Sequence, residues 1–382
     1  MIATIHTRAW RPEHVALIGT SPGCAAPVIP PERVVRIAPG QDVWDLGPVR
    51  TPSGAVARLD RAELWIAISA PAQGHPSARH DIARLRFLLR EGGRWTDCGP
   101  LFPDGASLGS REWAASGTYD PATRRIEVLY TAAGWRDRPG PRFEQRIVAT
   151  SAEIRRDGDG LAVGPWMPHR IVLEADRATY MAADAPDGEP GFIKAFRDPF
   201  PVTDPRDGTD WVLFAGSLAG AASDFNGVVG VARREAHGHM SLHEPLITAD
   251  GVNNELERPH TVVHGGLHYL FLSTQRRTFA PGVSGPNGLY GFVSDALLGP
   301  YEPVNGSGLV LRNPDEEPYQ AYSWLVLPDL SVASFVDMHS LGGRSPAEID
   351  AAGDAIARAH FGGTIAPVLR LDIRGTVVEL VA

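Results

Sequence analysis

The feature that most constrains the fold is an alternation of apolar and polar residues that recurs along the whole chain. Segments of this kind, rich in β-branched and aromatic side chains, occur at residues 62–69, 125–133, 210–217, 267–274 and 331–338. A two-residue period is typical of half-buried β-strands. Turn-forming pairs precede the last four segments, namely Asp120-Pro121, Asp207-Gly208, Gly265-Gly266 and Pro328-Asp329. We therefore expect each segment to be the second arm of an antiparallel hairpin.

One segment near the carboxyl end has the signals of a helix. Ser345 can cap it, Pro346 suits its first position, Glu348 completes a capping box, and Gly362-Gly363 can end it. The chain also contains 41 glycines and 33 prolines, a density that favours many short strands and turns over long helices. We expect an all-β protein with one late helix.

Composition and charge narrow the functional classes. No flexible linker divides the 382 residues, so we expect a single domain over residues 1–382. The net charge of −9, with no basic run, disfavours a nucleic-acid partner or an anionic membrane surface. No run of about 18 apolar residues and no signal peptide is visible. We expect a chain that is cytoplasmic or is secreted by a signal-independent route.

Polar motifs precede the predicted strands at intervals of roughly 60–85 residues. They are Trp44-Asp45, Glu112-Trp113, Arg197-Asp198-Pro199, Glu255-Leu256-Glu257-Arg258-Pro259 and Gln320-Ala321-Tyr322-Ser323. Five similar sheets around an axis form a single five-bladed β-propeller, in which the innermost strands line a central channel. The motifs would then meet in one active-site funnel.

The residue types in these motifs suit sugar chemistry. Two carboxyl groups across a glycosidic bond suffice for retaining hydrolysis, and a third can hold sugar hydroxyls. Asp45, Asp198 and Glu257 are the candidates, with Trp44 and Trp113 as apolar surfaces and arginines as hydroxyl donors. A tryptophan here could instead fill a β core, and an Arg-Asp pair could be a structural ion pair. The joint recurrence of acid, aromatic and arginine favours the sugar site.

Collinear motifs along the chain resemble those of glycoside hydrolase family 68, which contains levansucrases, inulosucrases and bacterial β-fructofuranosidases. They are VWDLGPVRTPSG around Asp45, EWAASGTYD around Trp113, FRDPFPVTDPRDG around Asp198, ELERPHTVVHGGLHYLF around Glu257, TFAPGVSGPNGLYGFVSD at 278–295, QAYS around Tyr322 and HFGGTIAP at 360–367. The resemblance implies a five-bladed propeller that takes sucrose as fructosyl donor.

The resemblance also implies a role for each matched residue. Asp45 corresponds to the nucleophile, Asp198 to the stabiliser of the transition state, and Glu257 to the general acid and base. The residues implied to bind the fructosyl unit are Trp44, Trp113, Arg197 and Arg258. Glu255 and Tyr322 match positions nearer the leaving glucose, and Gln275 matches a position linked to acceptor binding.

Three departures from the family pattern bear on the fate of the fructosyl unit. Many relatives have Ser where Ala114 stands, and many levansucrases have Glu and Asn where Ala215 and Ser217 stand. Gln275 replaces the Arg or His of levan formers. With fewer contacts to hold a sugar acceptor, water should attack the fructosyl-enzyme more often than a sugar does. We therefore expect a β-fructofuranosidase that transfers fructose to water and short sugar acceptors. Levansucrase or inulosucrase is the near alternative.

Two more distant alternatives remain open. A five-bladed arabinan- or xylan-acting glycosidase would also place three carboxylates in a funnel, and a non-catalytic sugar-binding propeller would need neither acid nor nucleophile. We expect no metal and no cofactor. Asn254 replaces the Asp of the calcium-binding branch, and Asp204, Asp207 and Asp210 are better explained by a hairpin turn than by a calcium loop.

Overall fold

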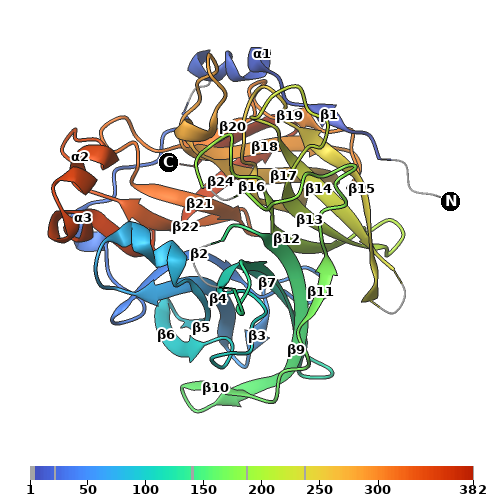
Figure 1. Cartoon of the computed structure of the whole chain (residues 1–382), viewed down its shortest axis with the longest axis vertical. Coiled ribbons are helices and arrows are strands. Elements are labelled where there is room, and N and C mark those ends of the chain that lie inside the picture. Colours follow the sequence, from blue (N-terminus) through green and yellow to red (C-terminus); the bar gives the residue numbers. More distant parts are fainter. Residues whose placement is uncertain (1–4, 21–22, 139–141, 186–187, 236–237, 382) are drawn as a thin grey trace.

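Five sheets surround a central axis in the computed structural model, which describes residues 5–20, 23–138, 142–185, 188–235 and 238–381 (Figure 1). Each sheet has five strands. The innermost strands contact one another in a ring, in the order β2, β7, β12, β16 and β21, and their labels gather near the middle of the view. The predicted five-bladed propeller is confirmed.

The blades follow one another along the chain. Blade I contains β2 (Gln41–Pro48), β3 (Arg58–Leu59), β4 (Ala62–Pro71), β5 (Arg84–Glu91) and β6 (Arg94–Pro100). Blade II contains β7 (Arg111–Asp120), β8 (Arg125–Ala133), β9 (Gln145–Asp157), β10 (Gly160–Val163) and β11 (Arg170–Leu173). Blade III contains β12 (Phe196–Thr203), β13 (Asp210–Ser217), β14 (Gly227–Arg234) and β15 (Met240–Thr248), with β1 (Arg8–Ala9) at its outer edge.

The last two blades are built in the same way. Blade IV contains β16 (Glu257–His264), β17 (Leu267–Thr274), β18 (Gly288–Ser294), β19 (Glu302–Pro303) and β20 (Leu309–Arg312). Blade V contains β21 (Ala321–Val326), β22 (Ser331–Met338), β23 (Phe361–Ile365), β24 (Leu369–Arg374) and β25 (Val377–Leu380).

The predicted strands are the second strands of the five blades. Residues 125–133, 210–217, 267–274 and 331–338 coincide with β8, β13, β17 and β22, and residues 62–69 lie within β4. Each pairs antiparallel with the innermost strand of its blade. The hairpin interpretation is therefore confirmed, including the turn between Asp204 and Asp210.

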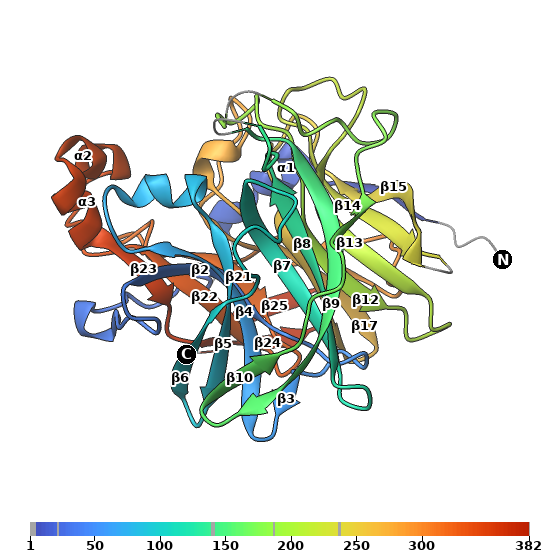
Figure 2. The ribbon, with the colours of Figure 1, turned by 60° about the horizontal axis from the view of Figure 1, so that its bottom comes forward.

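The predicted late helix is two short helices, α2 (Pro346–Ala351) and α3 (Asp354–His360), which stand out from the side of the propeller (Figure 2). The capping box forms as predicted, since Glu348 N donates to Ser345 Oγ at 3.3 Å and Ser345 N donates to Glu348 Oε2 at 2.8 Å. Gly353, at φ 98°, breaks the helix because this conformation is open mainly to glycine.

Other helical segments are short. They are α1 (Pro12–Val15) and the 3₁₀ turns η1 (Ile18–Thr20), η2 (Pro31–Arg33), η3 (Pro76–Asp81) and η5 (Arg276–Thr278). No helix in the described ranges is long and apolar enough to cross a membrane.

The N-terminal segment, described over residues 5–20 and 23–40, contacts four blades before the first blade begins. It joins blade III through parallel pairing of β1 with β15, and the buried Trp10 packs among Phe279, Tyr290 and Phe292 of blade IV. Its hydrogen bonds then reach the other three blades in turn. Trp10 Nε1 donates to Ser307 O of blade IV at 3.0 Å. Ile29 N and Ile37 N donate to Gln320 Oε1 (2.9 Å) and Thr364 Oγ1 (3.2 Å) of blade V, and Arg36 Nη1 donates to Asp42 Oδ1 of blade I at 2.8 Å. The segment thus links blade III to blade I.

Candidate active site

Each innermost strand is interrupted by a bulge at the same height in the ring. The register with the second strand shifts after Trp44, Trp113, Arg197, Glu257 and Tyr322. We call these five residues the upper ring. The residues that follow them, Asp45, Ala114, Asp198, Arg258 and Ser323, form the lower ring. Bulges re-aim side chains and recur beside active sites.

Four lower-ring residues adopt a left-handed backbone that non-glycine residues seldom adopt. The φ angles are 46° at Asp45, 61° at Asp198, 50° at Arg258 and 58° at Ser323. Each such residue costs about 1–3 kcal/mol and persists only where its surroundings enforce it. Every predicted site residue except Glu255 and Gln275 belongs to one of the two rings. The five distant motifs therefore meet through one repeated backbone device.

Arg197 links three carboxylates. Its Nη2 donates to Glu255 Oε1 at 2.8 Å and to Glu257 Oε1 at 3.0 Å, and its Nε lies 4.0 Å from Asp198 Oδ2. All three carboxylates lie against a guanidinium that is itself almost completely buried. Although burial opposes the charge, these acids raise the pKa of Arg197, so it stays positive.

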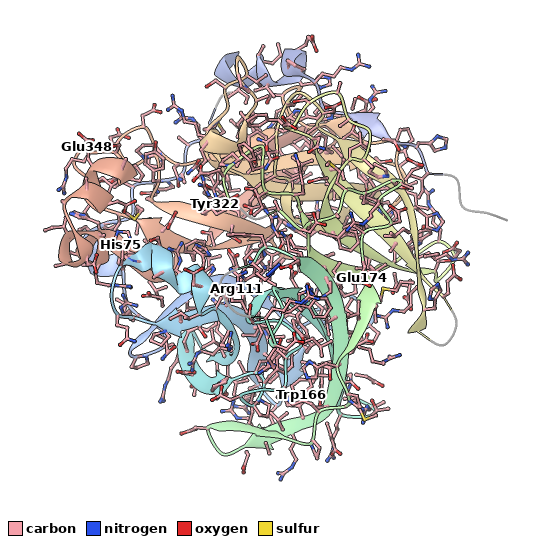
Figure 3. The ribbon with its side chains drawn as sticks, in the orientation of Figure 1. His75, Arg111, Trp166, Glu174, Tyr322 and Glu348 are labelled. Atoms are coloured by element: carbon pink, nitrogen blue, oxygen red, sulfur yellow. The ribbon has the colours of Figure 1, made fainter. Side chains whose placement is uncertain are left out.

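Glu257 is hydrogen-bonded on both oxygens. Oε1 accepts from Arg197, and Oε2 accepts from the Tyr322 hydroxyl. Burial and then the negative charge of Glu257 raise the pKa of Tyr322 well above its usual value, so the phenol remains a donor. Tyr322 and the buried Arg111 both lie near the centre of the molecule, whereas Glu348 and Trp166 lie at its periphery (Figure 3).

Asp45 and Asp198 both resist ionisation. Burial raises the pKa of Asp45, against the positive charges of Arg258 and Arg79 and a hydrogen bond from the Ser323 hydroxyl. Burial also raises the pKa of Asp198 to about 6, although Arg197 and the Arg258 backbone N–H, which donates to Oδ2 at 3.0 Å, oppose that shift. Two acids of raised pKa in one funnel are typical of a reactive site.

The two tryptophans have different surroundings. Trp44 is buried; its ring centroid lies 5.7 Å from that of His80 in a T-shaped contact, and the Arg79 guanidinium lies 5.4 Å over its ring. Trp113 is half-buried, and Arg111 lies 5.2 Å over its ring. The Trp113 indole N–H has no hydrogen-bond partner among the described residues. Trp113 is thus a partly exposed aromatic side chain whose indole N–H is buried and, within the described part of the chain, unpaired.

A charged group near Gln275 was missed by sequence reasoning. Gln275 Oε1 accepts a hydrogen bond from Arg277 Nε at 2.9 Å. Burial raises the pKa values of Glu255 and Asp337 and lowers that of His80; in all three, the positive charge of Arg277 contributes in the lowering direction. These residues and Arg277 therefore lie near one another, on the side of the site where Glu255 lies.

Other contributors also escaped sequence reasoning. Arg79 Nη2 lies 3.8 Å from Asp337 Oδ1, and Ser323 supplies Asp45 with the hydroxyl that Ala114 lacks. No local motif distinguishes Arg79 or Asp337, but Ser323 is the last residue of the quoted QAYS motif. No group of three His, Cys, Asp or Glu side chains in the described part of the chain is placed to hold a metal.

The comparisons with known proteins agree with this geometry. The levansucrase/invertase family model matches residues 5–228 and 220–381. The chain belongs to glycoside hydrolase family 68. It is 33% identical to a levansucrase of Zymomonas mobilis over 362 residues, which cover 87% of this chain and 80% of the relative. The family assignment makes the chain an enzyme, a glycoside hydrolase or fructosyltransferase.

Solved structures of family 68 type share the fold. An inulosucrase from Halalkalicoccus jeotgali bound to kestose is 38% identical, with a TM-score of 0.92, 98% coverage of this chain and 95% of that chain. The catalytic domain of a β-fructofuranosidase from Microbacterium saccharophilum has a TM-score of 0.84 at 21% identity, covering 99% of this chain and 91% of that one. The second similarity bears on the fold alone.

Proposed function

We propose that this family 68 enzyme transfers the fructosyl unit of sucrose to sugar acceptors, as a levansucrase or inulosucrase does. The observation that carries the proposal is the junction of Glu255, Glu257 and Asp198 on Arg197, beside Asp45, in one funnel. Similarity to levansucrases and to a kestose-bound inulosucrase supports transfer more than the hydrolysis expected from the departures in sequence.

In the proposed mechanism, Asp45 attacks the anomeric carbon of the fructosyl unit while Glu257 protonates the departing glucosyl oxygen. A covalent fructosyl-enzyme results. Glu257 then deprotonates an acceptor hydroxyl, which attacks the same carbon with net retention. Asp198 accepts hydrogen bonds from ring hydroxyls that strengthen as the oxocarbenium character grows. Arg197 and Tyr322 hold Glu257, and Trp44 and Trp113 supply apolar surface to the fructosyl unit.

Two sequence arguments for hydrolysis are weaker in the structure. Ala215 and Ser217 are completely buried in β13, and Ser217 Oγ accepts from Ala195 N at 2.9 Å, so neither can contact an acceptor. Gln275 is neutral, but its Oε1 accepts a hydrogen bond from the exposed Arg277. Arg277 therefore supplies a positive charge on the side of the site where levan formers have Arg or His. A sugar acceptor outcompetes water only if binding raises its local concentration. Glu255, Arg277 and Asp337 offer charged contacts for that purpose.

The test is an analysis of sugar products after incubation with sucrose. Transfer predicts that free glucose exceeds free fructose and that kestose-type oligosaccharides or longer fructans accumulate. Near-equal glucose and fructose would support the hydrolase instead. Glu257→Gln keeps the shape of the side chain and loses the proton, so turnover should fall at least 10³-fold with KM little changed. Absence of any activity on sucrose by the unaltered protein would overturn the proposal.

A further inference from the structure

Arg258 is matched by family resemblance to the sugar-binding residues, but its contacts are with the protein beneath the upper ring. Nη1 donates to Ser323 Oγ at 3.0 Å, and Nη1 and Nη2 donate to Leu46 O at 3.3 and 3.4 Å. The backbone N–H donates to Asp198 Oδ2 at 3.0 Å. The Arg258 guanidinium thus contacts the bulges of β2 and β21, and the Arg258 backbone N–H contacts the bulge of β12.

These partners connect Arg258 to both aspartates. Leu46 follows Asp45 in the bulge of β2, and the Ser323 hydroxyl is itself hydrogen-bonded to Asp45. Arg258 also has one of the left-handed backbone conformations of the lower ring, with a φ of 50°. One residue therefore joins the backbone next to Asp45, the hydroxyl partner of Asp45 and the carboxylate of Asp198.

A cavity, which we call the axial cavity, lies behind the lower ring. It has a volume of about 750 Å³ and is lined by the later parts of all five innermost strands. Asp198, Arg258 and Ala114 line it, whereas no upper-ring residue does. Added to Gly47, a Cβ atom would lie 3.3 Å from Arg258 Nη2, so the guanidinium packs closely against β2. Arg258 therefore lies at the boundary between the sugar site and this axial cavity.

We propose that Arg258 is a positioning residue rather than a sugar ligand, which holds the Asp45 and Asp198 bulges in place and closes the floor of the active site against the axial cavity. The proposal rests on the proposed function for its kinetic consequences. A misplacement of about 1 Å in reacting groups can cost about 10²-fold in rate. Lysine cannot replace the arginine, because a single ammonium cannot bridge Leu46 O and Ser323 Oγ as a planar fork does.

The kinetic test uses Arg258→Ala and Arg258→Lys, with Arg50→Ala as the matched control. Arg50 also lines the axial cavity, but its Nη2 donates to Pro201 O and its guanidinium stacks on Phe200, away from the aspartates. Both Arg258 variants should lose about 10²-fold or more in kcat, with KM within about threefold. A sugar ligand would instead show its loss mainly in KM, and that result would overturn the proposal.

The pH profile gives a second readout. Without the charge of Arg258, the pKa of Asp45 should rise further, so the acidic limb of kcat/KM should move to higher pH in Arg258→Ala and stay unchanged in Arg50→Ala. An unmoved limb would contradict the proposal. The charged and titratable groups that also face Asp45 and remain in the variant are Glu257, Arg79, Asp198, Tyr322 and Asp337.

Chemical rescue and a crystal structure complete the test. Guanidinium ion can reach the vacated site from the axial cavity, so it should restore kcat of Arg258→Ala at least tenfold and leave Arg50→Ala unaffected. A structure of Arg258→Ala should show displaced Asp45 and Asp198 bulges, a result independent of any activity on sucrose. Bulges that keep their positions in Arg258→Ala would contradict the positioning role. Absence of activity on sucrose in the unaltered protein would contradict only the proposed function.

Discussion

Replacing Asp198 by Asn should make the protein more stable at neutral pH while it abolishes turnover. The folded protein raises the pKa of this carboxyl from 3.8 to about 6, mainly by burial. The unfolded chain therefore releases the proton at lower pH than the folded one, and stability falls as pH rises from about 4 to about 6. Two pKa units correspond to about 3 kcal/mol at neutral pH, which is an upper limit.

The amide removes this cost and keeps an oxygen for the Arg258 N–H. Arg197 retains Glu255 and Glu257 as partners. For a chain of 382 residues the unfolding entropy is about 0.8 kcal/mol/K, so a gain of up to about 3 kcal/mol raises Tm by as much as about 4 °C. Calorimetry at pH 7.5 should show the gain, and at pH 4.5 most of it should disappear.

The matched control is Asp159→Asn, which makes the same charge change at an exposed position and should move Tm by less than about 1 °C. Two results would refute the reasoning. One is a lower Tm for Asp198→Asn at pH 7.5, and the other is a stabilisation of equal size at pH 4.5, where the native carboxyl is already protonated.

Other predictions concern the reaction. Arg277→Ala should lower the ratio of transferred to free fructose several-fold, whereas Arg276→Ala, at the neighbouring position that is also exposed, should not; equal product ratios in the two variants would remove Arg277 from the acceptor site. The acidic limb of kcat/KM should lie at about pH 6 or higher, because Asp45 and Asp198 must both be ionised, burial raises both pKa values and that of Asp198 is about 6; a limb below about pH 4.5 would contradict this. A crystal structure should place the Asp45 and Glu257 carboxyl groups about 5–5.5 Å apart, and a separation above about 6.5 Å would point to inversion instead.

The second strand of each blade was predictable from the sequence, because it is largely buried and, in four of the five blades, follows a turn-forming pair. β8, β13, β17 and β22 begin and end where the alternation does. The helix was only half predictable: its capping box is local, but the break at Gly353 depends on how α3 packs. The predicted end at Gly362-Gly363 is also shifted, because α3 ends at His360 and Phe361 begins β23.

The sequence motifs predicted that these residues would lie close together, but not how their side chains are oriented. Strand alternation assigns neighbouring residues to opposite faces, and a bulge reverses that assignment beyond it. Nothing in Glu257-Arg258 indicates that one side chain reaches Tyr322 while the other reaches Leu46 O. Arg79, Arg277 and Asp337 are brought to the funnel by packing between distant segments, so no local pattern marks them.

The N-terminal segment that contacts four blades has a consequence for synthesis on the ribosome. Its hydrogen-bond partners follow 238 residues later for Thr7 and 327 residues later for Ile37. At about 5–20 residues per second, the segment waits roughly 15 s to a minute for these partners to leave the ribosome. The hairpins of each blade are local and can form meanwhile. Because these partners are synthesised late, closure of the ring is one of the last folding events. Trp10 cannot reach its blade IV partners until they have been synthesised, so its side chain stays exposed until then. The nascent chain should therefore be most prone to aggregate just before the ring closes.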